Sequence, residues 1–64
     1  MNKVMEEIGS LEQEFVNVPV DILKEHLTDK YEISGEKVDS ILKQLKAKGL
    51  IYEPRNGLVK RLEN

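Results

Sequence analysis

The sequence lacks the residues on which several classes of small protein depend. It has 64 residues, with no Cys, no Trp and one His. Without cysteine there is neither a disulfide framework nor a thiolate metal site. The lone histidine, His26, is a poor metal ligand because zinc needs three or four protein ligands. We therefore expect no cofactor or metal in this chain, and we interpret His26 as a half-exposed helix residue.

Long hydrophobic runs and nucleotide-binding motifs are also missing. No run of about 18 apolar residues is present, which predicts that nothing in the chain spans a membrane. Met1-Asn2-Lys3 leads into an acidic segment, unlike a signal peptide. No G-x-x-x-x-G-K-[ST] loop occurs, so nucleotide hydrolysis by this chain alone is not expected. These absences predict a single soluble, intracellular, non-catalytic domain over residues 1–64.

The charge is divided unevenly between the two halves of the chain. Residues 1–32 carry three Lys and eight Asp or Glu, a net charge of −5. Residues 33–64 carry five Lys, two Arg and four acids, a net charge of +3. This division predicts one surface that repels polyanions and another that tolerates them. The total of −2 is far from that of a tight DNA-binding domain, so any contact with nucleic acid should be weak and salt-sensitive.

Apolar residues at helical spacing predict three helices. The first covers about residues 3–14, the second begins near Pro19–Asp21 and ends near Lys30 or Tyr31, and the third begins after Ser34 and ends at Gly49. Ser34 suits an N-cap and Gly49 suits the residue after a helix. Acids that fall outside the apolar stripe of the first helix are expected in solvent: Glu6, Glu7, Glu12 and Glu14. The three stripes are Val4, Ile8, Leu11 and Phe15; Val20, Leu23, Leu27 and Tyr31; and Val38, Ile41, Leu42 and Leu45.

The last third of the chain predicts a β-hairpin. Its strands are expected at Leu50–Glu53 and Leu58–Leu62, joined by a turn at Pro54–Gly57 in which Asn56 and Gly57 tolerate positive φ. One or two residues near Val18 are expected to add a short third strand. The predicted fold is therefore mainly α with a small antiparallel hairpin: a winged helix-turn-helix. We expect four hairpin residues to face the core: Leu50, Tyr52, Leu58 and Leu62.

The third helix and the hairpin carry the candidate contacts to DNA. Opposite the apolar stripe, the third helix presents Glu36, Ser40, Lys43 and Ala47. Small and polar residues there permit close approach to a groove, and Arg55 at the hairpin tip could bind a phosphate. The predicted nucleic-acid-binding residues are Lys37, Ser40, Lys43, Gln44, Arg55, Lys60 and Arg61.

The segment Ile41–Gly57 resembles a known family, the C-terminal winged-helix domain of minichromosome-maintenance (MCM) replicative helicases, in particular of the archaeal type. In that family an aliphatic helix ends in glycine and continues as Ile or Leu, aromatic, Glu, Pro and Arg. Ile51-Tyr52-Glu53-Pro54-Arg55 matches this run, and Gly57 matches the glycine of the turn, whereas Asn56 replaces a frequent proline. Val18-Pro19-Val20 resembles the start of the family's second helix. The resemblance covers about residues 4–62.

This resemblance implies a regulatory module of a hexameric AAA+ ATPase that unwinds duplex DNA in replication. ATP and Mg²⁺ would bind elsewhere in the parent protein. The expected partners are the helicase core of the parent hexamer, loading factors and weakly bound duplex DNA, in a cytoplasmic, nucleoid-associated setting. The isolated domain is expected to be monomeric.

Two other interpretations fit the same residues. One is a free-standing transcription regulator, which would need a dimer interface that the sequence does not provide. The other is a protein-docking module that uses the acidic face of the first two helices or the groove beside the hairpin.

Overall fold

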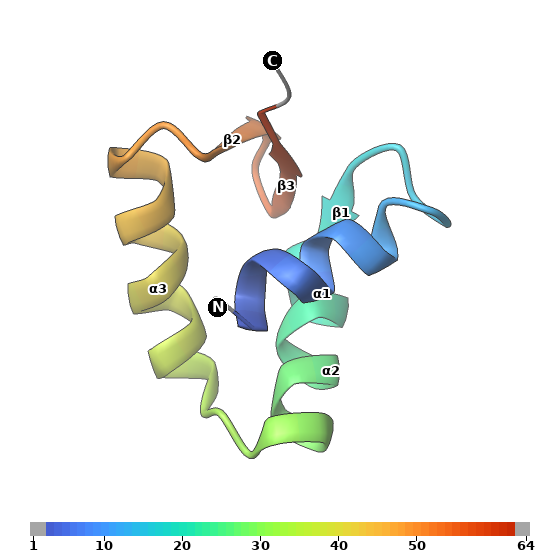
Figure 1. The fold of residues 1–64 in the computed structure, drawn as a ribbon, viewed down its shortest axis with the longest axis vertical. Coiled ribbons are helices and arrows are strands. Elements are labelled where there is room, and N and C mark those ends of the chain that lie inside the picture. Colours follow the sequence, from blue (N-terminus) through green and yellow to red (C-terminus); the bar gives the residue numbers. More distant parts are fainter. Residues whose placement is uncertain (1–2, 63–64) are drawn as a thin grey trace.

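The computed structural model describes residues 3–62, which form three helices and a three-stranded antiparallel sheet. In chain order these are α1 (Lys3–Leu11), β1 (Val18–Pro19), α2 (Val20–Tyr31), α3 (Gly35–Ala47), β2 (Ile51–Arg55) and β3 (Leu58–Arg61). In Figure 1, α2 and α3 form the two sides of a V joined by the turn at residues 32–34, and the sheet lies above its open end. The predicted winged helix is thus confirmed, although α1 is shorter than expected and gives way to a turn at residues 12–14.

The helical stripes form the core. The apolar stripe of α1, formed by Val4, Ile8 and Leu11, packs with that of α2. The stripe of α3 completes this core. Because every helix buries one face against the others, neither α2 nor α3 needs a long apolar segment of its own. The fully assembled core consists of Val4, Ile8, Leu11, Val18, Leu23, Leu27, Val38, Leu42, Leu45, Ile51 and Val59.

Both ends of α3 are closed by the residues that the sequence predicts. The Ser34 hydroxyl accepts a hydrogen bond from the Lys37 amide at 3.2 Å, which satisfies one free donor of the first turn. At the other end Gly49 has a φ of 75°, a conformation that L-residues rarely adopt. The Gly49 and Leu50 amides donate to the carbonyls of Lys46 and Leu45, which is a Schellman motif.

This Schellman motif explains why the predicted core face of the hairpin is wrong. Leu50 belongs to the helix cap, and Ile51, as the first strand residue, points into the core at 2% exposure. Side chains alternate along a strand, so a phase error of one residue reverses every position. The structure therefore exposes three of the predicted core residues, Leu50, Tyr52 and Leu62, and only half-buries the fourth, Leu58. The core positions of the hairpin are occupied by Ile51 and Val59 instead.

The sheet has the strand order β1-β3-β2, so β3 lies in its centre. Val18 pairs with Val59, which confirms the short third strand. β2 and β3 pair through Tyr52 and Lys60, with an irregularity between Tyr52 and Arg55. The hairpin is also tied to α2, because the Val20 amide donates to the Gly57 carbonyl at 2.8 Å.

The expectation that Glu7 lies in solvent is also wrong. Its residue exposure is only 4%, because it lies on the side of α1 that faces α2. There its carboxylate accepts hydrogen bonds from His26 Nδ1 at 3.0 Å and from Lys30 Nζ at 3.2 Å. A buried charge is tolerated where it is paired and hydrogen-bonded, and these contacts from α2 meet that condition. His26 is half-exposed as predicted.

Candidate nucleic-acid interface

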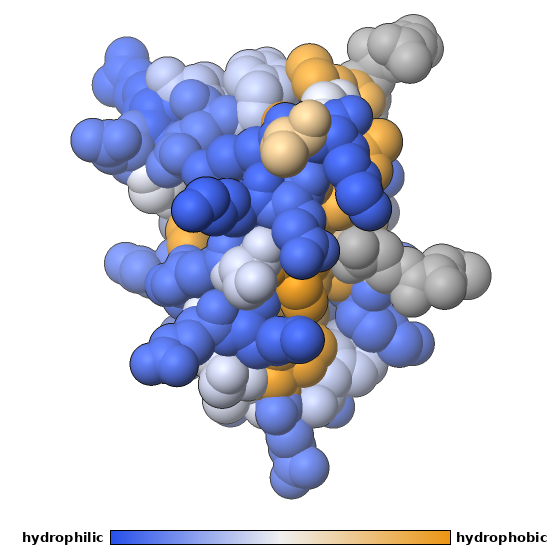
Figure 2. Space-filling view, turned by 90° about the vertical axis from the view of Figure 1, so that its left-hand side faces the viewer, coloured by the Kyte–Doolittle hydropathy of each residue, from blue (hydrophilic) through white to orange (hydrophobic). Residues whose placement is uncertain are grey.

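The outward side of α3 is polar and accessible, as the helical spacing predicts. Lys37, Ser40, Lys43 and Gln44 are all exposed. Figure 2, which faces this side of the molecule, shows a mainly hydrophilic surface with apolar areas near its top and in its lower centre. Side chains on the two edges of this surface differ in their surroundings, because one edge faces α2 and the hairpin and the other does not.

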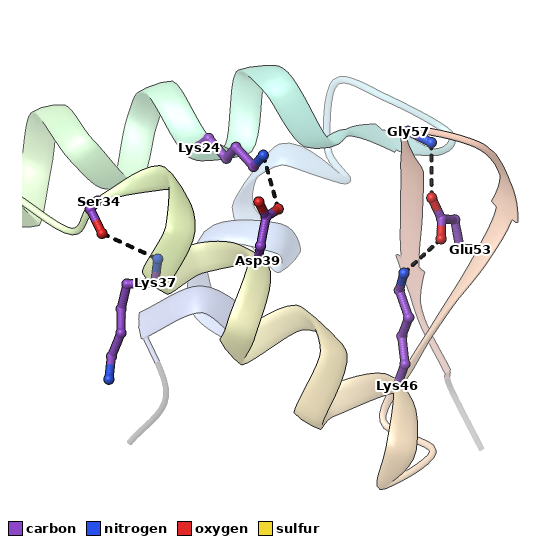
Figure 3. A network of polar contacts seen from close by, with 7 residues as sticks. All are labelled: Lys24, Ser34, Lys37, Asp39, Lys46, Glu53 and Gly57. Atoms are coloured by element: carbon purple, nitrogen blue, oxygen red, sulfur yellow. Dashed lines mark hydrogen bonds and ion pairs between the residues drawn. The ribbon is translucent and has the colours of Figure 1, made fainter.

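One row of side chains runs along the edge of α3 that faces α2 and the hairpin. Asp39, Lys43 and Lys46 are spaced by four and three residues, so they lie on one side of the helix. Asp39 forms an ion pair with Lys24 of α2 at 2.9 Å, and Lys46 forms one with Glu53 of β2 at 2.6 Å (Figure 3). Lys43 lies between these two ion pairs in the row and forms no ion pair with any residue in the range 3–62.

Glu53 contacts both α3 and the turn of the hairpin. One carboxylate oxygen accepts from Lys46, and the other accepts from the Gly57 amide at 2.9 Å (Figure 3). The hydrogen bond from Lys46, followed by that from Gly57, lowers the pKa of Glu53 below its ordinary value of 4.5, so the group is ionised at neutral pH. Together with the bond from Val20 to the Gly57 carbonyl, these contacts hold the turn from both sides. Arg55, the last residue of β2, therefore lies next to an anchored turn, and it is exposed.

The remaining predicted contact residues are distributed over other surfaces. Lys37 points away from α2 and from the hairpin in Figure 3, and Gln44 shares its edge of α3. Lys60 is half-buried on β3, opposite Tyr52. Of the predicted set, Lys43 lies three residues before Lys46 on α3 and Arg55 lies two residues after Glu53 on β2, so each is close in the chain to one partner of the ion pair between α3 and the hairpin.

Arg61 is held inside the domain. Its Nε donates to Glu12 Oε1 at 2.8 Å, and its amide donates to the other oxygen of Glu12 at 2.9 Å. Its guanidinium lies against Gly9, where a Cβ atom would approach Nη1 to 2.9 Å. The role that the structure gives Arg61 is to join β3 to α1.

Sequence reasoning missed the two ion pairs that border Lys43. The helical period places Asp39 and Lys46 on one edge of α3, but their partners Lys24 and Glu53 lie on other elements. No spacing rule joins positions 24 and 39, because the contact depends on how α2 packs against α3. The single local signal in the sequence was the position of Glu53, an acid four residues before the turn glycine Gly57, from whose amide it accepts a hydrogen bond.

Other kinds of site find no support in residues 3–62. No group of three His, Cys, Asp or Glu side chains converges to hold a metal ion. No pocket is formed by this part of the chain, and none of its helices is long and apolar enough to cross a bilayer.

Comparison with known proteins identifies the family. A family model described as the MCM protein C-terminal winged helix-turn-helix domain matches residues 1–61. No individual curated protein matches the chain. The family match covers all six elements of the fold, including the anchored hairpin and its Glu53–Gly57 contact. The chain belongs to the family of MCM protein C-terminal winged helix-turn-helix domains.

Proposed function

We propose that this domain modulates the DNA-unwinding and ATPase activities of the MCM helicase that carries it, through weak contact with duplex DNA. The observation that supports this most directly is the surface around Lys43 and Arg55. Both cations are exposed, both lack an ion pair within residues 3–62, and each lies within three residues of one partner of the Lys46–Glu53 ion pair, which connects α3 to the hairpin. Two free cations near a helix surface fit phosphate contact without base recognition.

Weak intrinsic affinity is compatible with such a role. A domain attached to a protein that already encircles or tracks DNA meets the duplex at a high effective concentration. Its own affinity can then be low, and contact can form and break as the helicase moves. In this proposal the ATP and Mg²⁺ sites belong to the parent protein, and the helicase core and loading factors are its protein partners.

The test uses the parent helicase and the isolated chain in parallel. In the helicase, the double variant Lys43→Ala/Arg55→Ala should change unwinding and ATPase rates in the same direction as deletion of the domain. In the isolated chain it should weaken duplex binding at every sequence. It should also flatten the dependence of log K on log salt by about 1.8, because each lost phosphate contact contributes about 0.9.

The matched control removes two cations on the α1–α2 side, Lys3 and Lys30, which lie over Tyr31 and beside Glu7. This double variant should leave duplex binding unchanged, with folding checked by circular dichroism. Equal affinity and equal salt dependence for the Lys43→Ala/Arg55→Ala variant and the wild type would refute direct DNA contact by this surface.

A second candidate function, docking to a protein, is favoured by the outward face of the hairpin. Leu50, Tyr52 and Leu62 are 43%, 40% and 50% exposed. Leu62 donates its amide to the Leu50 carbonyl at 3.0 Å, and Tyr52, the second residue of β2, follows Leu50 by two residues. Contiguous apolar side chains on a surface are typical of interaction sites.

The double variant Leu50→Ser/Leu62→Ser separates the two functions. If the helicase core or a loading factor docks here, this variant should abolish regulation in the parent protein while leaving duplex affinity of the isolated chain intact. Regulation that survives this variant but not Lys43→Ala/Arg55→Ala would assign the function to DNA contact alone. No observation favours the free-standing transcription regulator, and the family match points to an MCM protein instead.

A further inference from the structure

The surface around Lys43 contains two carboxylates that a phosphate-binding surface would be expected to avoid. Asp39 lies one turn before Lys43 on α3, and Glu53 lies on the facing strand of the hairpin (Figure 3). Each neutralises a lysine that otherwise points toward the same surface: Lys24 at 2.9 Å and Lys46 at 2.6 Å.

Both ion pairs are open to solvent and can therefore exchange partners. The side chains of Lys24 and Asp39 are 30% and 59% exposed, and those of Lys46 and Glu53 are 39% and 30% exposed. Exposed pairs contribute little to stability, so they are not needed to hold the fold together. A DNA phosphate can compete for each lysine, but the carboxylate that it displaces remains nearby and repels it.

Glu53 is the more effective of the two competitors because it cannot turn away. Its second oxygen is held by the Gly57 amide at 2.9 Å, and Gly57 is in turn bonded to α2 through Val20. The negative charge is therefore fixed beside Lys46. Asp39 has Lys24 as its partner among residues 3–62 and no comparable backbone anchor.

We propose that Asp39 and Glu53 serve as internal counter-anions that keep Lys24 and Lys46 from DNA phosphates and thereby set the low duplex affinity of the surface formed by α3 and the hairpin. This inference rests on the proposed DNA contact and concerns how its strength is set. With both carboxylates in place, Lys43 and Arg55 are the cations of this edge that are free for phosphate. Without the two carboxylates, Lys24 and Lys46 are free to bind phosphate as well.

The test measures duplex binding of the chain carrying Asp39→Asn and Glu53→Gln, singly and together, between about 50 and 200 mM salt. Each substitution should steepen the dependence of log K on log salt by about 0.9, which corresponds to roughly a threefold larger loss of affinity across that range. The glutamine at position 53 retains an oxygen that can accept from the Gly57 amide. The chemical shift of that amide reports whether the hairpin keeps its conformation.

The matched control makes the same change in charge at a distance. Glu14→Gln and Glu25→Gln remove two exposed carboxylates from the α1–α2 half, and neither forms an ion pair within residues 3–62. A gain in the Asp39→Asn/Glu53→Gln variant that exceeds the gain in this control supports the inference. Equal gains in both would overturn it, because the effect would then reflect net charge alone.

A second background shows whether the released lysines are responsible. Adding Lys24→Ala and Lys46→Ala to the Asp39→Asn/Glu53→Gln variant should return the salt dependence to the wild-type value, and a persistent gain would contradict the inference. Loss of binding in Lys43→Ala/Arg55→Ala, together with no gain in Asp39→Asn/Glu53→Gln, refutes the counter-anion role and leaves the DNA contact standing. Absence of binding in every variant refutes both.

Discussion

The carboxylates of α1 and of the turn after it form the same kind of ion pair as those of α3 and the hairpin, but in a different environment. The Glu7 and Glu12 side chains are 5% and 13% exposed, whereas those of Glu53 and Asp39 are 30% and 59% exposed. A buried carboxylate needs its partners, because without them the desolvation of the charge is not compensated. An exposed carboxylate has water as an alternative partner. Burial therefore decides which ion pairs hold the fold and which are available for exchange with a ligand.

The two regions also join different elements. Glu7 links α1 to α2, and Glu12, in the turn after α1, links this turn to β3 through Arg61. These contacts close the N-terminal helix onto the rest of the domain. The contacts of Asp39 and Glu53 instead border an open surface, where a polyanion could replace the acid. Glu7 and Glu12 thus hold the fold, whereas Asp39 and Glu53 border the surface on which partners can be exchanged.

The largest expected effect lies in the core that both regions enclose. Leu45→Ala removes a side chain that is 3% exposed in the centre of the α3 stripe. It should lower the free energy of unfolding by about 2–5 kcal/mol, because a cavity is left where apolar contacts were made. In so small a domain this loss is enough to unfold much of the population. Chemical and thermal denaturation measure this loss of stability. The control is Gln44→Ala, a substitution at the exposed neighbouring residue. A thermal midpoint within a few degrees of wild type would show that α3 does not depend on this face.

The next effect separates the buried ion pairs from the exposed ones. Glu7→Gln should lower the free energy of unfolding at neutral pH by about 1–2 kcal/mol, since hydrogen bonds to a charged group are lost but His26 and Lys30 remain partly solvated. Asp39→Asn should change it by less than about 1 kcal/mol, because the pair with Lys24 is exposed. Equal effects of these two substitutions would remove the distinction between the two regions.

The pH dependence of the same variant gives the sign of the Glu7 contribution. Burial raises the pKa of Glu7, but the hydrogen bonds from His26 and Lys30 outweigh it and hold the pKa below the ordinary value of 4.5. The stability from Glu7 is therefore present above about pH 4.5 and is lost as the pH falls through the lowered pKa. The unfolding curves of wild type and Glu7→Gln should converge in acid. A gap that stays constant into acid would show that the charge of Glu7 does not contribute.

The smallest expected effect concerns Gly9 and the Glu12–Arg61 contact. In a helix, Gly→Ala stabilises by about 1 kcal/mol when nothing opposes it. At position 9 the new Cβ would lie 2.9 Å from Arg61 Nη1, so the guanidinium must shift away from its place beside Glu12. Gly9→Ala should therefore be nearly neutral in the wild type and stabilising in an Arg61→Ala background. Urea denaturation of the four proteins of this cycle measures the coupling. An equal gain in both backgrounds would mean that Arg61 does not restrict position 9.

Much of the fold could be predicted from local patterns. The helical period placed Val4, Ile8 and Leu11, and later Val38, Leu42 and Leu45, in the core, because one helix can bury only one face. Ser34 and Gly49 marked both ends of α3 through the backbone groups that they satisfy. The phase of the hairpin could not be predicted in the same way. It depends on whether Leu50 belongs to the helix cap or to the strand, and both choices are compatible with the sequence.

The candidate site was less accessible to prediction than the fold. The exposure of Lys43 and Arg55 followed from the position of the apolar stripe and from the turn. The burial of Glu7, the engagement of Arg61 and the ion pairs of Asp39 and Glu53 each depend on a partner from another element. An isolated sequence states which charges exist, but it does not state which of them meet.

The sequence by itself determined the element order, the inward faces of the helices and the division of charge between the halves, because periodicity and composition are local properties of the chain. Only the tertiary structure decided the strand phase of the hairpin and the pairing of each acid with a base. Those outcomes depend on distances between residues that are remote in sequence, such as Lys24 and Asp39 or Glu12 and Arg61, and packing alone sets such distances.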